Sequence, residues 1–457
     1  MAFKLFKKEV TEEGAKPANK SNYLSGKEIR EIAKANAQEM RRLEKAKKRK
    51  LPESAYLTKM SDEKNILEVE NLHSYFFTDQ GVVKAVNGVS FNIPSNSTVG
   101  VVGESGCGKS VTSMSIMRLL QGPSGQIVEG AIRFKVSEYK RDERGNPIPV
   151  YERDENGEII NEPVLNKQGE QKLDKNGEPM VRPKQLKDAH GIGVFEQEEK
   201  VVDIAKMPIK HMYRLRGRQM SMVFQEPMTS LNPVFTIGNQ LDEVTLLHVP
   251  GATAEFAKER SIEMLNLVGI AMPERVYASY PHELSGGMRQ RVMIAMALAG
   301  EPRLIIADEP TTALDVTIQA QILDLFNDLK TKINSSILLI THDLGVIAEM
   351  ADYVVVMYAG RIIEQGTASE IFHNPMHPYT QGLQKSKPVV RRKVDRLYNI
   401  PGQVPNPIDM PNYCYFRDRC DRCIGKCGNG YPEFIQVSPT HSVSCYLYEQ
   451  EKEEKDV

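Results

Sequence analysis

Apolar and polar residues alternate along the first part of the chain, as in Leu67-Glu-Val-Glu-Asn-Leu72, Val82-Val-Lys-Ala-Val86 and Val89-Ser-Phe-Asn-Ile93. This period of two is typical of half-buried antiparallel strands. Four later runs are largely apolar: residues 97–102, 219–225, 303–309 and 336–342. Such runs are typical of strands buried on both faces of a parallel sheet. The pattern therefore predicts an α/β fold with a mainly parallel core sheet and a smaller antiparallel β subdomain.

Two other segments have the periodicity of helices. In residues 26–50 the apolar side chains recur at helical spacing beside a basic face: Ile29, Ile32, Ala33, Ala37, Met40 and Leu43. We expect a helix here, either in a solvated, partly disordered extension or in contact with anionic lipid or a partner. Residues 236–300 also predict helices, with breakers at Pro250-Gly251 and at Pro273.

Turn signals and composition divide the chain into regions. Four turn signals end in glycine: Asp142-Glu-Arg-Gly145, Asp154-Glu-Asn-Gly157, Asn166-Lys-Gln-Gly169 and Asp174-Lys-Asn-Gly177. The short runs between them predict a stack of β-hairpins, which we interpret as a surface insertion at 135–207. The predicted regions are a basic extension at 1–60, an α/β domain at 61–385 that contains the insertion, and a proline-rich linker with a small cysteine-rich C-terminal domain at 386–457.

The run at 97–102 leads into Gly103-Glu-Ser-Gly-Cys-Gly-Lys-Ser110, which fits the phosphate-binding pattern G-x-x-x-x-G-K-[ST] at every fixed position. A strand before it and a helical run after it disfavour a chance glycine-rich turn. Lys109 would reach the β- and γ-phosphates of ATP, and Ser110 would hold Mg²⁺. The residues predicted to surround the nucleotide are Gly103, Glu104, Ser105, Gly106, Cys107, Gly108, Lys109, Ser110 and Val111.

Polar side chains end the three other apolar runs. Asp308 and Glu309 end one of them, Gln225 ends another and His342 the third. Ligands bind at the carboxyl ends of parallel strands, so these residues predict one site. Asp308 would help hold Mg²⁺, and Glu309 would act as general base on a water if the chain turns at the strand's end. The plainer alternatives are an acidic helix cap and a packed or solvated histidine.

Composition narrows the function classes. The chain has 457 residues, a formal net charge of −1 and six cysteines. It is long enough for one large domain with appendages, and its overall charge indicates no particular partner. No run reaches the roughly 20 apolar residues that span a bilayer, and the N-terminus lacks the apolar core of a signal peptide. We therefore expect a cytoplasmic protein whose membrane role is peripheral.

The stretch Leu284-Ser-Gly-Gly-Met-Arg-Gln-Arg291 opens a predicted helix and resembles the signature sequence of ABC-transporter ATPases. With the motifs above, residues 66–445 resemble that family, the insertion excepted. In the family two ATPase domains pair head to tail, and the signature of one closes over the γ-phosphate held by the other. This chain carries one phosphate loop and one signature sequence, which implies pairing with another molecule. Ser285, Gly286, Gly287 and Met288 would form the second phosphate contact.

The resemblance implies a role for each matching residue. Phe76 matches the aromatic that stacks on adenine, although an aromatic in a strand is also ordinary core. Gln225 matches the glutamine that senses Mg²⁺ and the lytic water and links to the membrane domain. The acids at 308 and 309 match the magnesium-associated and catalytic acids. Asp315 matches a loop that crosses the dimer interface, and His342 matches the histidine that contacts the γ-phosphate.

Three longer stretches resemble the D-type ATPase subunits of oligopeptide and dipeptide importers: residues 224–238, 280–297 and 307–321. The F-type partner ATPase more often has glutamine where this chain has Met288. The resemblance implies ATP-driven oligopeptide import from the cytoplasmic face of the cell membrane. The implied partners are an F-type ATPase subunit in a heterodimer, two transmembrane permease subunits and, indirectly, an extracytoplasmic peptide-binding protein, with no nucleic acid.

Other functions fit parts of the sequence. An importer of dipeptides or nickel would use the same ATPase motifs. Soluble ABC ATPases that act on ribosomes usually carry two cassettes in one chain, and those that act on DNA split one cassette with long coiled coils; this chain has neither. A redox protein built on the cysteine-rich tail is disfavoured because no electron-transfer motif accompanies it.

Five of the six cysteines lie near the C-terminal end: Cys414, Cys420, Cys423, Cys427 and Cys445. Four thiolates suit tetrahedral zinc or a four-iron cluster, and free or disulfide-bonded cysteines are a further alternative. The importer resemblance, which includes Tyr415-Phe-Arg-Asp-Arg419, implies a 4Fe–4S cluster on Cys414, Cys420, Cys427 and Cys445, with zinc as its rival. No residue of the predicted ATP site lies in this tail, so we expect a structural role for it.

Overall fold

The computed structural model describes residues 25–166, 168–188, 191–312, 316–386 and 398–449. Its largest sheet has eight strands in the order β13-β14-β12-β11-β3-β10-β9-β8. Their bounds are β3 Thr98–Val102, β8 Met220–Val223, β9 Leu304–Asp308, β10 Ser336–Thr341, β11 Tyr353–Tyr358, β12 Arg361–Thr367, β13 Ile435–Gln436 and β14 Ser442–Val443. The strands from β11 to β8 are parallel, as the apolar runs predict, and β12, β14 and β13 extend the sheet antiparallel.

A second sheet has four antiparallel strands in the order β2-β1-β4-β7. Its strands are β1 Asn65–Phe77, β2 Val82–Pro94, β4 Gly125–Tyr139 and β7 Gln197–Asp203. The runs at 82–86 and 89–93, predicted as separate strands, form the single strand β2. Gly88 lies at the register shift inside it, at φ +82°, because the bulge needs a left-handed backbone there.

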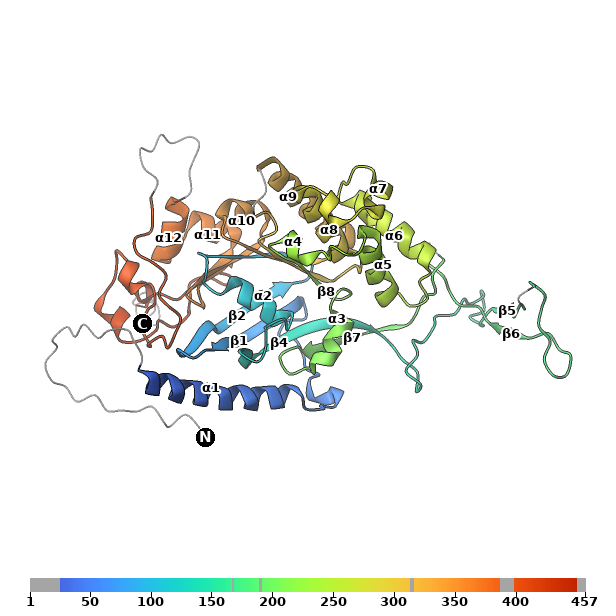
Figure 1. Cartoon of the computed structure of the whole chain (residues 1–457), viewed down its shortest axis with the longest axis horizontal. Helices are drawn as coiled ribbons and strands as arrows, with labels where there is room; N and C mark the ends of the chain where they lie inside the picture. Colours follow the sequence, from blue (N-terminus) through green and yellow to red (C-terminus); the bar gives the residue numbers. More distant parts are fainter. Residues whose placement is uncertain (1–24, 167, 189–190, 313–315, 387–397, 450–457) are drawn as a thin grey trace.

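Helices surround the two sheets (Figure 1). Their bounds are α1 Gly26–Lys47, α2 Lys109–Ile116, α3 Met212–Leu215, α4 Pro227–Ser230, α5 Ile237–His248, α6 Ala254–Leu267, α7 Pro273–Ala278, α8 Gly286–Leu298, α9 Val316–Ile333, α10 Leu344–Met350, α11 Ala368–His373 and α12 Pro378–Lys385. The helices α5 to α8 form one group beyond β8, so the helices predicted at residues 236–300 are present and make up a helical subdomain. Among the described residues, no helix has the length and apolar character needed to cross a membrane.

The core sheet is buried on both faces. Neighbouring residues of β9 belong to different apolar clusters: Ile305 packs with Leu339 of β10 on one face, and Ile306 packs with Leu338 on the other. All four side chains are fully buried. This two-sided burial explains why the strands read as continuous apolar runs and not as alternating ones.

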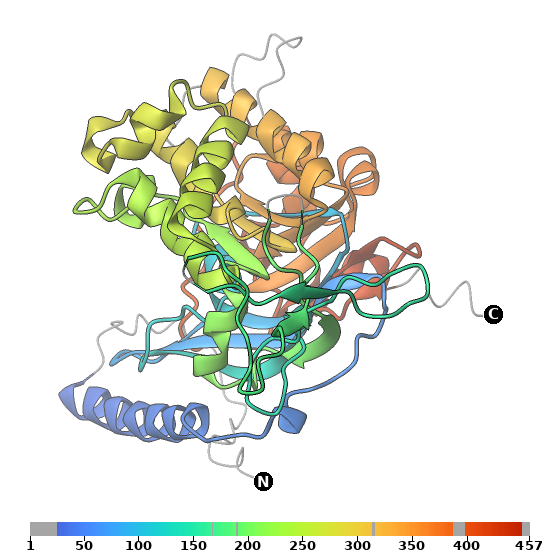
Figure 2. The same cartoon turned by 90° about the vertical axis from the view of Figure 1, so that its right-hand side faces the viewer.

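The region predicted as an insertion belongs partly to the antiparallel sheet, because β4 runs to Tyr139 and its last part, from Arg133 on, pairs with the whole of β7. Between them, Figures 1 and 2 show long hairpin-like loops that project from the body of the molecule and include β5 (Asn161–Pro163) and β6 (Val181–Pro183). The turns are those the sequence predicts: the N–H of Gly145 donates to the carbonyl of Asp142 at 2.9 Å, and Gly157 repeats this with Asp154 at 3.0 Å.

The predicted basic helix forms α1 and packs along the antiparallel sheet (Figure 1). Its start is fixed by a capping box between Ser25 and Glu28. The buried Asn36 side chain donates to the carbonyl of Thr78 at 2.6 Å, and Gln126 of β4 donates to Glu44 at 2.8 Å. This part of the extension therefore packs against the body of the protein, whereas residues 1–24 lie outside the described part.

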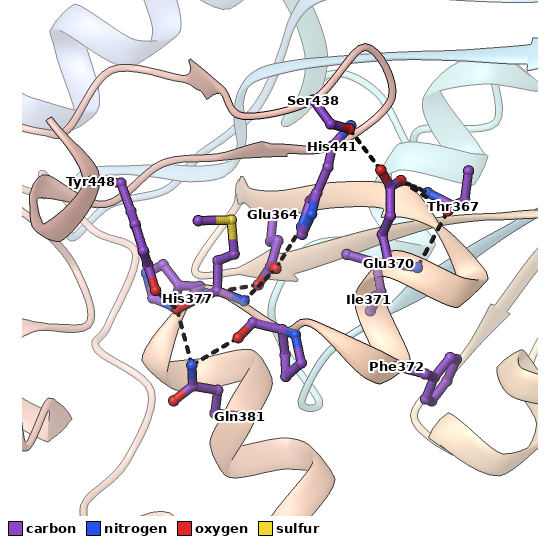
Figure 3. Close-up of polar contacts among 12 residues, drawn as sticks. Glu364, Thr367, Glu370, Ile371, Phe372, His377, Gln381, Ser438, His441 and Tyr448 are labelled. Atoms are coloured by element: carbon purple, nitrogen blue, oxygen red, sulfur yellow. Dashed lines mark hydrogen bonds and ion pairs between the residues drawn. The ribbon is translucent and has the colours of Figure 1, made fainter. Parts of the chain in front are cut away.

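The C-terminal segment is not the separate cysteine-rich domain that the sequence predicts. Its strand β14 pairs with β12 of the core sheet, and Tyr415 and Phe416 belong to the main apolar cluster. Figure 3 shows the polar contacts of this junction: the buried His441 ring lies 2.9 Å from Glu364 of β12, and Ser438 donates to Glu370 at 2.6 Å. The prediction was wrong because the segment buries its apolar side chains against the ATPase core instead of forming a core of its own.

The same junction predicts a pH-dependent stability. Burial lowers the pKa of His377 from 6.5 to about 4; nearby Glu364 opposes this, and Arg422 adds to it. Between pH 6.5 and about 4, His377 therefore stays neutral in the folded chain, whereas in the unfolded chain it takes up a proton. We expect the free energy of unfolding to fall by roughly 3 kcal/mol from this group as the pH drops from about 6.5 to about 4.

Urea unfolding at several pH values measures this loss. In the native chain the N–H of Tyr379 donates to the His377 ring at 3.0 Å. The asparagine of His377→Asn can still accept this hydrogen bond, but it cannot be protonated. The variant should lose less stability than the native chain across this pH range. Equal losses in both chains would rule out His377 as the cause.

Candidate nucleotide site

The glycine-rich loop joins β3 to α2 at the carboxyl edge of the core sheet. The strand β3 lies between β10 and β11, so the loop opens at the centre of the sheet. Gly108 caps α2 at φ +98°, and a Cβ at this position would overlap the carbonyl oxygen of Ala85. Only glycine fits there, which is why the pattern requires it. The loop and the helix N-terminus together form an anion-binding element.

Lys109 folds back over the loop. Its ammonium group donates to the carbonyls of Gly103 at 2.7 Å and Glu104 at 3.1 Å, and the residue is 5% exposed. The positive charge is therefore held inside the loop, where the phosphates of a nucleotide would lie.

The structure brings Ser110 and Asp308 together, as the sequence predicts. The Ser110 hydroxyl donates to Asp308 at 3.0 Å, and Ser113 donates to the other carboxyl oxygen at 3.4 Å. Burial raises the pKa of Asp308, and the charge of Glu309 adds to this rise, although both serines and Lys109 oppose it. A divalent cation would favour the ionised form, and hard oxygen donors beside a phosphate loop are the ligands that Mg²⁺ takes.

Glu309 points away from Asp308 because the chain turns between them. Its backbone has φ +48°, and its N–H donates to the carbonyl of Ile340 at 2.8 Å. The carboxylate accepts from Gln225 at 3.1 Å and lies 3.3 Å from the His342 ring. It is 12% exposed, so it is accessible at one side. Three strand ends of one parallel sheet thus contribute to a single polar group.

Sequence reasoning missed two donors near these acids. Thr312 donates to Glu309 at 2.9 Å, and Ser113 contacts Asp308 from the second turn of α2. Thr312 follows the strand end by only a few residues and Ser113 follows Ser110 by one helical turn. Both positions were therefore open to prediction from spacing alone.

The structure does not bring the signature residues to the loop of the same chain. Ser285 caps α8 and accepts from the N–H of Met288 at 3.3 Å, and Gly286 and Gly287 form the first turn of this helix. The helix lies in the group beyond β8, whereas α2 lies below the middle of the sheet (Figure 1). The Gln290 side chain, one turn on, donates to the carbonyl of Pro310 at 2.6 Å and so connects α8 to the end of β9.

Phe76 comes from the other sheet. Phe76 is half-buried near the end of β1, paired with Val83 of β2 and Gly125 of β4, and so belongs to the antiparallel sheet. Asp315 lies outside the described residues. Ser105 and Gly106 are exposed on the loop, and Cys107 is fully buried beneath it.

The predicted metal centre of the tail is wrong. In the described ranges, no group of three or more His, Cys, Asp or Glu side chains is placed to hold a metal ion. The five described tail cysteines are free thiols: Cys414, Cys420, Cys423, Cys427 and Cys445. Neither the 4Fe–4S cluster nor its zinc rival is supported.

The physical reason lies in the surroundings of these thiols. Burial raises the pKa of Cys414 to about 12 and of Cys445 to about 11, and neighbouring thiols add to the rise. A thiolate is the form that binds metals, and burial disfavours that form of these two side chains. Cys414 and Cys420 pack against the main apolar cluster, and Cys445 belongs to a small cluster with Met376 and Val443. Cys414, Cys420 and Cys445 therefore act here as small apolar residues, whereas Cys423 is exposed.

The tail nevertheless reaches the phosphate loop. Arg419 donates from both terminal nitrogens to the carboxylate of Glu104, at 2.6 and 3.0 Å, and the N–H of Glu104 donates to the hydroxyl of Tyr379 at 2.8 Å. The sequence predicts a structural role for the tail, and the structure adds a direct contact with the phosphate loop. No local sequence signal connects residues so far apart in the chain.

Comparison with known proteins agrees with this geometry. The chain matches the family described as "ABC transporter" over residues 86–176 and 189–312. It also matches "Oligopeptide/dipeptide transporter, C-terminal region" over residues 363–427. The second match spans β12 to the tail, which includes both Tyr379 and Arg419.

Three curated proteins of Bacillus subtilis (strain 168) match nearly the whole chain. Oligopeptide transport ATP-binding protein AppD is 42% identical over 390 residues, 85% of this chain and 99% of that protein. Dipeptide transport ATP-binding protein DppD is 41% identical, with coverage of 85% and 96%. Oligopeptide transport ATP-binding protein OppD is also 41% identical, with coverage of 84% and 88%. The chain therefore belongs to the ABC transporter ATPases of the oligopeptide/dipeptide transporter family.

Proposed function

We propose that this chain binds and hydrolyses ATP to drive the import of oligopeptides by an ABC transporter. The observation that supports this proposal is that two groups of functional side chains lie at the same edge of the core sheet. One group is the phosphate loop with Ser110 against Asp308, and the other is Glu309 with Gln225 and His342. Phosphoryl transfer to water needs both, because it depends on a charge-stabilising cradle and a positioned nucleophile.

Each group has a chemical role in this proposal. Lys109 and the loop N–H groups bind the β- and γ-phosphates, and Ser110 and Asp308 hold Mg²⁺, which neutralises charge on the phosphates. Phe76 stacks on the adenine. Glu309 accepts a proton from the attacking water. Its hydrogen bonds from Gln225 and Thr312 fix the carboxylate in one orientation.

A second ATPase chain completes the site. The signature residues 285–288 cap α8 with a helix N-terminus, yet they lie in the helical group and not at the loop. Head-to-tail pairing places the signature of each chain over the phosphates of the other, with Asp315 at the interface. Met288 favours a heterodimer with an F-type subunit.

The proposed partners in the membrane are two permease subunits, served by an extracytoplasmic peptide-binding protein. Exposed apolar side chains follow Gln225 closely in the sequence or precede it, which supports a docking surface in this region: Phe224 is 38% exposed, Phe235 is 51% and Val234 is 74%. The chain then lies peripherally on the cytoplasmic face. A dipeptide or nickel importer is the alternative, and a relative named for dipeptide transport is 41% identical, compared with 42% and 41% for the two named for oligopeptide transport.

Identification of the chains that copurify with this protein tests the proposal. After mild detergent extraction, mass spectrometry should find two hydrophobic permease subunits and a second ABC ATPase in stoichiometric amounts. A soluble, single-chain ATPase without such partners would contradict the transport function. The Lys109→Ala variant should still copurify them, because it changes nucleotide binding and not the docking surface.

The basic end of α1 carries a further prediction. Four exposed cations gather there: Lys45, Lys48, Arg49 and Lys50. Each cation near an anionic surface contributes about 1 kcal/mol at low salt. Changing all four to glutamine should weaken salt-sensitive association with membranes or a partner at least about tenfold, with ATP affinity unchanged.

The binding of the full-length protein to vesicles with and without anionic lipid, at low and high salt, measures this effect. A matched control changes four exposed cations of the hairpin loops to glutamine: Arg144, Lys172, Lys175 and Lys187. The control should bind as the native chain does. Equal binding by both variants would leave α1 as a solvated structural helix.

A further inference from the structure

One residue of the phosphate loop, Glu104, is held in place by the tail and by its neighbours. Glu104 follows Gly103 in the loop, and three groups fix it. Its N–H donates to Tyr379, its carbonyl accepts from Lys109 at 3.1 Å, and its carboxylate pairs with Arg419 through two hydrogen bonds. Arg419 comes from the C-terminal segment, and Tyr379 comes from α12, which precedes it.

Arg419 is built to hold a carboxylate at this place. Its side chain is 5% exposed, and its Nε donates to the carbonyl of Pro401 at 2.8 Å. One terminal nitrogen also lies 3.3 Å from the Tyr358 hydroxyl. The hydrogen bonds to Glu104 are the main cause that raises the pKa of Arg419. A bidentate arginine–carboxylate pair fixes both position and orientation.

The tyrosine is held as firmly. Tyr379 is fully buried and packs against Tyr358, with ring centroids 4.8 Å apart, and against Phe416 of the tail at 5.5 Å. Burial is the main cause that raises its pKa, so the hydroxyl stays neutral. A neutral hydroxyl in a rigid aromatic cluster is a well-placed acceptor for the Glu104 N–H.

We propose that Arg419 and Tyr379 are positioning residues for ATP binding: through Glu104 they hold the phosphate loop in the shape that receives the nucleotide. This rests on the proposed function of the loop. Without the two contacts the loop has to become ordered when ATP binds, and that ordering lowers the affinity. Once ATP is bound, the phosphates themselves order the loop. The loss therefore falls on KM and not on kcat.

The test uses the complete transporter complex, with ATP turnover measured against ATP concentration. Arg419→Met and Glu104→Gln should each raise KM for ATP about tenfold, with kcat within about twofold of native. The double variant should be no worse than either single variant, because both remove one interaction. Tyr379→Phe should raise KM severalfold. Arg417→Met, in the same short helix but paired with Asp418, is the matched control and should change neither constant.

Several outcomes overturn the proposal. Native KM in Arg419→Met and Glu104→Gln would show that the pair only anchors the tail. Multiplied effects in the double variant would show that the two residues act independently. A fall in kcat at native KM would place them in the chemical step. If Arg419→Met does not fold, Glu104→Gln decides, since Glu104 is 30% exposed and the change keeps its size.

A separate variant distinguishes this proposal from the function on which it rests. Lys109→Ala removes the charge at the centre of the loop and should abolish detectable ATP binding. Retained binding in Lys109→Ala would refute the nucleotide site itself. Lost binding in Lys109→Ala together with native KM in Arg419→Met and Glu104→Gln would refute only the role of the tail.

Discussion

Glu309→Gln is expected to reduce ATP turnover by about 100-fold or more while ATP affinity stays within a few-fold of native. Glutamine keeps the size of the side chain and can still contact Gln225 and Thr312, but it cannot take a proton from water. Asp308 and the phosphate loop, which would hold the nucleotide and Mg²⁺, are unchanged. The measurement is steady-state phosphate release by the complete complex, with ATP affinity measured separately.

The matched control is Glu349→Gln, an exposed acid on α10, the helix that follows β10. It should hydrolyse ATP at the native rate. Near-normal hydrolysis by Glu309→Gln would remove Glu309 as general base. Asp308 could not then take over the role without release from Ser110 and Ser113.

His441→Leu should lower the free energy of unfolding by about 3 kcal/mol. Glu364 is fully buried, and its carboxyl oxygens accept from the His441 ring and from the N–H groups of Met376 and His377. Leucine fills much of the same volume but removes one of these three donors from a buried polar group. The tail should therefore detach from β12 at lower urea concentrations than in the native chain.

Urea unfolding followed by limited proteolysis of the tail measures this change. The control is His373→Leu, which removes an exposed histidine of α11 whose ring contacts the carbonyl of Ser369 in its own helix. This variant should change stability by less than about 0.5 kcal/mol. Equal stability of both variants would mean that the buried pair does not hold the tail.

The core of this fold could be predicted because its signals are local. The strands at 303–309 and 336–342 read as apolar runs, since a parallel sheet buries both of their faces. The loop at 103–110 is fixed by a backbone geometry that only glycine allows. The turn between Asp308 and Glu309 is the condition on which the predicted role of Glu309 depends, and the structure has this turn.

The tail could not be predicted in the same way. Its strand β14 is two residues long and exists because it pairs with β12. Arg419 contacts Glu104, which lies 315 residues away in the sequence, and the spacing of apolar and polar residues cannot predict such a contact. The cysteine spacing suggested a metal centre because spacing reports only which residues are near in sequence. It does not report burial, which keeps Cys414 and Cys445 as neutral thiols.

Uptake of a labelled oligopeptide into sealed vesicles tests the central claim most directly. The vesicles contain the complex purified through this chain, with ATP supplied on the side where the chain lies and the peptide-binding protein on the other. The account predicts uptake that needs ATP and Mg²⁺, that Glu309→Gln abolishes and that Glu349→Gln leaves intact. Full ATP hydrolysis by the complex without peptide movement, or ATP-driven movement of nickel alone, would contradict it.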